Sequence, residues 1–180
     1  MRRCSVADAR WLDVDSAARE AVEHFRNAVA IHGEGGFDAP GLAGYKSAMA
    51  FMHAMQSGHT SMESALCRIL DILGEERPTG TAWHDDLIRR VRSERPGSRP
   101  PILAPGAADQ ADETRRFRHL AMRTYGSFKA SEAKKSVVAA KALARDLLAE
   151  IERFRIAIDP PSGGAPPAPL ASRKARRSKS

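Results

Sequence analysis

One apolar stripe at helical spacing runs through residues 42–73, and it restricts the fold more than any other feature. The stripe consists of Leu42, Tyr45, Met49, Met52, Gln56, His59, Met62, Leu66, Ile69 and Leu73. This spacing is typical of one face of a helix and not of a strand. Thr60 and Glu63 offer a capping box that would restart a second helix after Gly58. We predict one long helix instead, with a kink near Gly58 as an option, because the stripe crosses that point without a phase jump.

Four further segments carry a helical pattern: residues 15–31, 82–93, 105–125 and 131–158. Glycine-rich or proline-rich stretches separate them at 32–41, 74–80 and 95–106. Pro105 suits the first turn of a helix, and Gly126 is a plausible terminator. Alanine, leucine and methionine supply much of the apolar content, and strand-like alternation is missing from the sequence. The predicted fold is therefore all-α, an antiparallel helical bundle of about five helices.

The two ends of the chain differ from this central pattern. We assign residues 1–13 to an N-terminal extension, 14–158 to the helical domain and 159–180 to a disordered basic tail. The tail holds five of the cations (Arg173, Lys174, Arg176, Arg177 and Lys179) and no acid after Asp159. The chain has a formal charge of +7, so the rest of it is close to neutral. The tail is either a solubilising end or a segment that meets nucleic acid without sequence preference.

Several site classes find no support in the sequence. The two cysteines, Cys4 and Cys67, are too few for a disulfide framework, and no CxxC pair is present. The six histidines show neither HxxxH nor HExxH spacing, so we predict no metal and no cofactor. The first residues lack the apolar core of a signal peptide, and no apolar stretch is long enough to span a bilayer. We therefore expect a cytoplasmic protein that does not enter the membrane.

A cationic segment lies near the end of the fourth predicted helix. It reads RRFRHLAMRTYG and contains Arg115, Arg116, Arg118, His119, Arg123 and Tyr125 at residues 115–126. The i, i+4 spacing places Arg115, His119 and Arg123 along one stripe of the helix. Cations gathered in this way repel one another, which favours a position facing solvent or an anion.

This segment, together with WHDDLI at 83–88 and RPPIL at 99–103, resembles the HepT-like domains of the HEPN superfamily. The resemblance implies a homodimer whose subunits form a cleft for metal-independent RNA cleavage, as the toxin of a toxin–antitoxin system. The family motif is an arginine, four residues, a histidine, one residue and a tyrosine. Arg118 matches the motif arginine and Tyr125 the motif tyrosine, but Arg123 stands where the histidine should be.

This departure bears directly on catalysis. RNA cleavage without a metal needs a group that accepts the proton of the 2′-hydroxyl, and a guanidinium cannot do so near neutral pH. We therefore predict an RNA-binding site of Arg115, Arg116, Arg118 and Arg123 in which the ribonuclease activity is weakened or lost. His119 is included with Arg118 and Arg123 among the candidate catalytic residues, either as a substitute base or as an auxiliary group.

The resemblance also implies a partner for this chain. In HepT systems a nucleotidyltransferase, an MntA-like antitoxin, attaches adenylates to the motif tyrosine and so blocks the toxin. Tyr125 is either that modification site or a tyrosine that closes a helix end. The leading hypothesis is a HepT-like toxin–antitoxin or defence component. The alternative is a non-enzymatic HEPN antitoxin or scaffold protein that binds a nucleotidyltransferase or a toxin.

Three other features have an ordinary structural interpretation. His59 lies on the apolar stripe and is expected to be a core or interface histidine hydrogen-bonded to a neighbour. Trp83 and His84 are expected to anchor the short helix against the bundle, with RNA stacking as the alternative. The methionines at 49, 52, 55 and 62 suit either the core or an adaptable dimer surface.

Overall fold

A computed structural model describes residues 6–123 and 130–159, and the side chains within 9–118 and 132–159. Its helices are α1 (Val6–Glu34), α2 (Leu42–Ile72), α3 (Trp83–Arg92), α4 (Pro105–Arg123) and α5 (Lys134–Ile158), with a short 3-10 helix η1 (Ala130–Ala133) before α5. No strand occurs among the described residues, where Arg95 and Arg99 form one isolated bridge. The predicted all-α class is confirmed.

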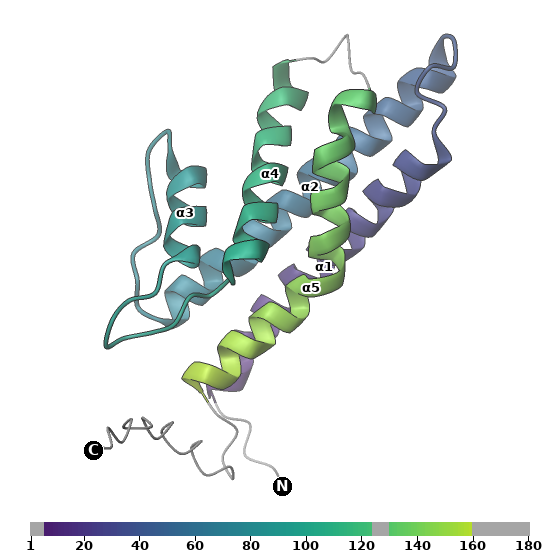
Figure 1. The fold of residues 1–180 in the computed structure, drawn as a ribbon. Coiled ribbons are helices and arrows are strands. Elements are labelled where there is room, and N and C mark those ends of the chain that lie inside the picture. The colour runs from purple at the N-terminus through teal and green to yellow at the C-terminus, as the bar shows by residue number, and fades with distance from the viewer. Residues whose placement is uncertain (1–5, 124–129, 160–180) are drawn as a thin grey trace, which may run out of the picture.

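The long helices form two antiparallel pairs, α1 with α2 and α4 with α5 (Figure 1). Helix α1 contacts both α2 and α5, and α4 contacts α5 and α2, so the four helices enclose one core. The short α3 contacts α4 and the C-terminal part of α2, outside the four-helix bundle. This arrangement brings side chains of α2, α3 and α4 together at one place.

Helix α2 runs without a break from Leu42 to Ile72, which confirms the single long helix. Gly58 has a packing role there, because a Cβ atom at this position would lie 2.8 Å from ring atoms of Phe25 on α1. The glycine thus lets the Phe25 ring approach the α2 backbone. Glu63, considered above as part of a capping box, is instead a buried member of the helix interior.

The predicted start of the first helix, Asp15, was wrong. Helix α1 begins at Val6, so part of the segment that we assigned to an N-terminal extension is helical. Trp11 and Val14 are fully buried in the core. Arg155 of α5 lies over the Trp11 ring, 5.3 Å from its centroid, so α5 also contacts this first part of α1.

The proline-rich segment between α3 and α4 is held against the bundle. Ile102 and Leu103 are fully buried, and their backbone N–H groups donate to the Val91 carbonyl at 2.9 and 3.1 Å. Helix α4 then begins at Pro105, as predicted. The fifth predicted helix began at Ser131, but residues 130–133 form the 3-10 turn and α5 begins at Lys134.

The methionines on the α2 stripe belong to the core, since Met52, Met55 and Met62 are buried and Met49 packs against them. Within the described ranges, no helix combines the length and the apolar character that crossing a membrane requires. The predicted tail lies almost wholly outside the described residues.

Candidate functional site

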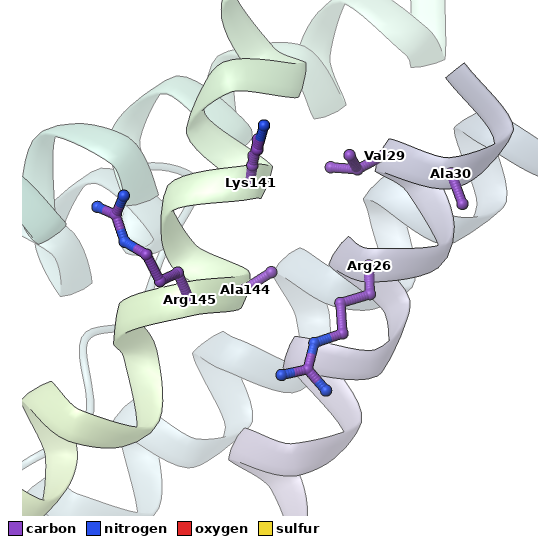
Figure 2. A pocket seen from close by; sticks show the side chains of 6 residues that line it. All are labelled: Arg26, Val29, Ala30, Lys141, Ala144 and Arg145. Atoms are coloured by element: carbon purple, nitrogen blue, oxygen red, sulfur yellow. The ribbon is translucent and has the colours of Figure 1, made fainter. Parts of the chain in front are cut away.

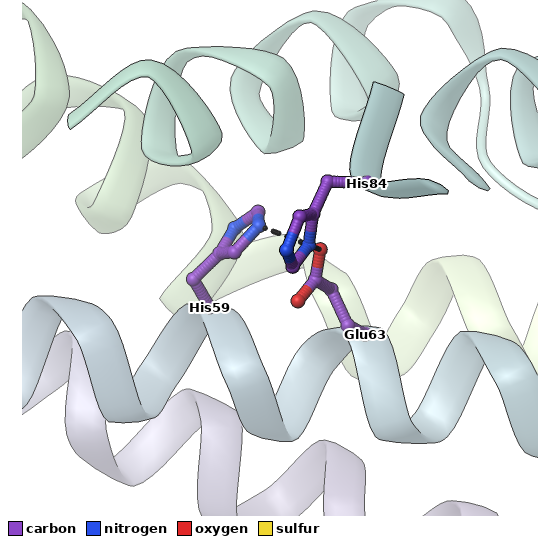
Figure 3. Close-up of side chains that lie close together, drawn as sticks. All are labelled: His59, Glu63 and His84. Atoms are coloured by element: carbon purple, nitrogen blue, oxygen red, sulfur yellow. Dashed lines mark hydrogen bonds and ion pairs between the residues drawn. The ribbon is translucent and has the colours of Figure 1, made fainter. Parts of the chain in front are cut away.

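A buried carboxylate joins three helices at the side of the bundle. Glu63 of α2 is only 3% exposed at its side chain, yet it contacts three cationic or ionisable groups. His59 Nε2 and His84 Nδ1 lie 3.0 and 2.5 Å from its Oε1 atom (Figure 3). Arg118 Nη1 lies 3.4 Å from Oε2. We call His59, Glu63, His84, Thr114 and Arg118 the Glu63 cluster.

Secondary structure explains how these side chains meet. His59 and Glu63 are four residues apart on α2 and therefore share one face of that helix. His84 stands in the first turn of α3, and Arg118 stands near the end of the described side chains of α4. The ring centroid of His84 lies 3.7 Å from that of Trp83, and Trp83 packs against the core. The predicted anchoring of α3 by this pair agrees with these contacts.

The protonation of His59 follows from its neighbours. The Thr114 hydroxyl donates to the Ala111 carbonyl at 2.9 Å, so its oxygen is left to accept a hydrogen bond. His59 Nδ1, 3.0 Å away, is therefore the donor to Thr114. His59 is completely buried, and its Nε2 faces Glu63 without the alignment of a hydrogen bond. The predicted core histidine is confirmed, and Glu63 is its charged neighbour.

Glu63 is ionised in this setting. Burial raises the pKa of its carboxyl group, but the contacts with His59 and His84 outweigh burial and hold the pKa below its usual range. An ionised carboxylate accepts hydrogen bonds and donates none. In the contact between His84 and Glu63, Nδ1–H of His84 is therefore the donor. The other ring nitrogen of His84, Nε2, takes no part in this contact.

His59, Glu63 and His84 are residue types that can hold a metal ion, and their donor atoms lie within 4.8 Å of one another. Sequence spacing did not reveal this group, because His84 comes from another helix. The distances between the donor atoms are shorter than those between ligands of one metal ion. Zinc ligands about 2.1 Å from the ion in a tetrahedral site stand about 3.4 Å apart, whereas both histidines approach the same oxygen at 2.5 and 3.0 Å.

The predicted cations on α4 differ in their surroundings. Arg118 is 29% exposed at its side chain, and its described contact is with Glu63. Arg115 pairs with Asp112 at 2.7 Å and with Asp85 at 3.2 Å. Arg116 is well exposed but pairs with Asp112 as well. The acids on α3 and α4 therefore offset the charge of Arg115 and Arg116.

The remaining predicted site residues lie at the edge of the described region. His119 and Arg123 belong to the backbone of α4, but their side chains are outside the described residues. Tyr125 lies outside them altogether. Their roles stay predictions.

A hollow lies between α1 and α5, away from the Glu63 cluster (Figure 2). Its lining is Arg26, Val29, Ala30, Lys141, Ala144 and Arg145. Arg145 is paired with Asp146 at 2.6 Å. This lining offers positive charge but neither histidine nor carboxylate, so it lacks the acid–base groups that the Glu63 cluster holds.

A family model described as HepT-like protein matches residues 50–158. That range contains all five residues of the Glu63 cluster and excludes α1. Neither the curated proteins nor the solved structures gave a match.

Proposed function

Because this chain belongs to the HepT-like protein family, we propose that it is the HepT-like component of a toxin–antitoxin or defence module and binds RNA beside the end of α4. The observation that carries the proposal is the state of Arg118. Its guanidinium is held by the buried Glu63, yet 29% of the side chain remains exposed. An arginine fixed in this way is suited to receive a phosphate group.

Cleavage through the family motif is weakened in this proposal. Arg123 occupies the position of the motif histidine and stays protonated near neutral pH, so it can attract phosphate but cannot accept a proton. We expect Arg115 and Arg116 to add less to RNA binding than Arg118, since each of them pairs with two carboxylates, whereas the described contact of Arg118 is with Glu63 alone. RNA binding with slow cleavage is the expected behaviour of this site.

The binding experiment compares Arg118→Ala with Arg19→Ala, a change at an exposed arginine on α1. Fluorescence anisotropy with a labelled single-stranded RNA at low salt measures the dissociation constant. We expect Arg118→Ala to weaken binding about 10-fold or more, and Arg19→Ala to leave it nearly unchanged. Equal affinities of the two variants would contradict an RNA site at Arg118.

The activity experiment restores the motif histidine through Arg123→His. We expect faster RNA cleavage and stronger growth arrest on expression than for the wild type, because imidazole can accept a proton near pH 7. Arg118→Ala in that background should relieve the arrest. If Arg123→His neither cleaves RNA nor arrests growth, the non-enzymatic antitoxin or scaffold function is favoured over a weakened enzyme.

We further propose that the chain acts as a homodimer in the cytoplasm and that a nucleotidyltransferase partner adenylates Tyr125. The family to which the chain belongs supports this partner. Co-expression with the nucleotidyltransferase of an adjacent gene, followed by mass spectrometry, should show adenylate on Tyr125 and none in Tyr125→Phe. Light scattering of the purified chain measures its oligomeric state, and a monomer would contradict the homodimer.

A further inference from the structure

One carboxylate holds an imidazole and a guanidinium that come from different helices. His84 of α3 contacts Oε1 of Glu63, and Arg118 of α4 contacts Oε2. With separations of 2.5 and 3.4 Å to the same carboxylate, the two groups lie within the span of one phosphodiester and its ribose. The family motif does not include His84, which stands 34 positions before Arg118 in the sequence.

His84 presents the tautomer that a base requires. Its Nδ1–H donates to Glu63, so in the neutral ring the lone pair is on Nε2. A carboxylate in this position fixes both the tautomer and the orientation of the ring. The side chain is 16% exposed, whereas His59 on the other side of Glu63 is completely buried. His84 can therefore meet a substrate, and His59 cannot.

We propose that His84 is the general base that replaces the missing motif histidine, with Glu63 as its positioning residue and Arg118 as the phosphate ligand. This inference rests on the proposed function, since it requires RNA bound at Arg118. It adds a proton acceptor to a site that the motif alone leaves without one.

The reaction is an intramolecular transesterification. The 2′-oxygen of the ribose forms a bond to phosphorus while its proton moves to Nε2 of His84. The bond from phosphorus to the 5′-oxygen breaks, and that oxygen takes a proton from water. The resulting hydroxide is neutralised by the proton that His84 then releases. The products are a 2′,3′-cyclic phosphate and a 5′-hydroxyl, and neither a metal nor a redox partner is required.

Several charged groups surround His84. Glu63 and His59 face it from α2, with the ring centroids of His59 and His84 6.5 Å apart. Arg118 faces it from α4 through Glu63, and Asp85 follows it on α3, where it pairs with Arg115. Among the described residues, Glu63 is the one group that hydrogen-bonds to the His84 ring, so Glu63 is the residue that holds the ring in place.

The test measures cleavage and binding of single-stranded RNA by the full chain, with His84→Ala as the main variant. We expect slow cleavage by the wild type and a loss of about 100-fold or more in His84→Ala, with unchanged RNA affinity. Added imidazole should restore cleavage by His84→Ala. His53→Ala removes an exposed histidine of α2 and should cleave like the wild type.

Glu63→Gln and Glu63→Asp together give a readout that loss of structure would not imitate. Glu63→Gln removes the carboxylate that fixes the tautomer and orientation of His84, so it should slow cleavage. Glu63→Asp keeps a carboxylate and should retain more of the cleavage rate than Glu63→Gln. Thermal unfolding of each variant identifies any that do not fold.

Several outcomes would overturn the proposal. The first is that His84→Ala cleaves RNA as fast as the wild type. The second is that added imidazole does not restore cleavage by His84→Ala. The third is that cleavage by the wild type depends on a divalent metal bound by the Glu63 cluster. If the wild type binds RNA through Arg118 but does not cleave it, this inference fails while the proposed function stands. If it binds no RNA, both fail.

Discussion

Arg99 shows how much a single buried side chain organises in this chain. It is 4% exposed, and its guanidinium donates to both carboxylate oxygens of Glu75 at 2.6 and 3.2 Å. It also donates to the carbonyls of Arg90, Ser93 and Pro100 at 2.9 to 3.2 Å. Arg99 therefore fixes the turn after α2, the end of α3 and the proline-rich segment in one place.

This ion pair predicts how stability depends on pH. The hydrogen bond from Arg99 lowers the pKa of Glu75, and burial opposes this only in part. Because the folded-state pKa is below the unfolded value, the pair stabilises the fold above about pH 4.3 and loses this contribution as pH falls. At pH 7 the wild type should have a larger unfolding free energy than Glu75→Gln. Urea titrations should show that this difference shrinks toward pH 3. A constant difference would contradict the prediction.

At the scale of elements, the contact between α1 and α2 depends on Gly58. Alanine favours an α-helix by about 1 kcal/mol over glycine, so helix propensity alone would make Gly58→Ala stabilising. The Phe25 ring opposes this, because it lies within 2.8 Å of where the new Cβ would stand. We expect the clash to dominate and to lower the unfolding free energy by about 1–2 kcal/mol.

A double-mutant cycle tests that explanation. Phe25→Leu makes room, so Gly58→Ala should cost less in the Phe25→Leu background than in the wild type. Gly33→Ala is the matched control on α1, since nothing lies within 4 Å of its Cβ position and no loss of stability is expected. Urea denaturation monitored by circular dichroism measures all variants. Additive effects of the two substitutions would show that Phe25 is not the obstacle.

The helices themselves could be predicted from the sequence, but the start of α1 was placed too late. A 3.6-residue period with clear breakers defines α2, α3 and α4. Trp11 and Val14 continue the helical spacing of the apolar residues after Asp15, so the period already reaches back before the predicted start. What the sequence could not show is the contact of Trp11 with Arg155 of α5, because it joins distant segments.

At the scale of the molecule, the candidate site could be predicted only on α4. The motif pointed to Arg118, but Glu63 and His84 become its neighbours only when α2, α3 and α4 pack together. In the sequence, Glu63 was equally consistent with a helix cap, and His84 with a simple anchor. Their pairing depends on tertiary packing, so no spacing rule along the chain would have identified it.

The tail provides a last test that concerns the chain as a whole. Residues 160–180 contain five cations and no acid. Each cation that neutralises a phosphate of single-stranded RNA contributes about −0.7 to the slope of log affinity against log salt concentration. If all five engage, deletion of the tail should make that slope less steep by about 3.5. Binding titrations between 50 and 200 mM salt measure this change.

Charge and length of the tail can be separated by a second variant. Replacing its five cations with serine keeps the length and should reproduce the effect of the deletion. The effect of Arg118→Ala on RNA affinity should be the same with and without the tail, because we expect Arg118 and the tail to contact different phosphates independently. If deletion abolishes RNA binding, the tail alone is the RNA-binding element and the helical domain contributes no site at Arg118.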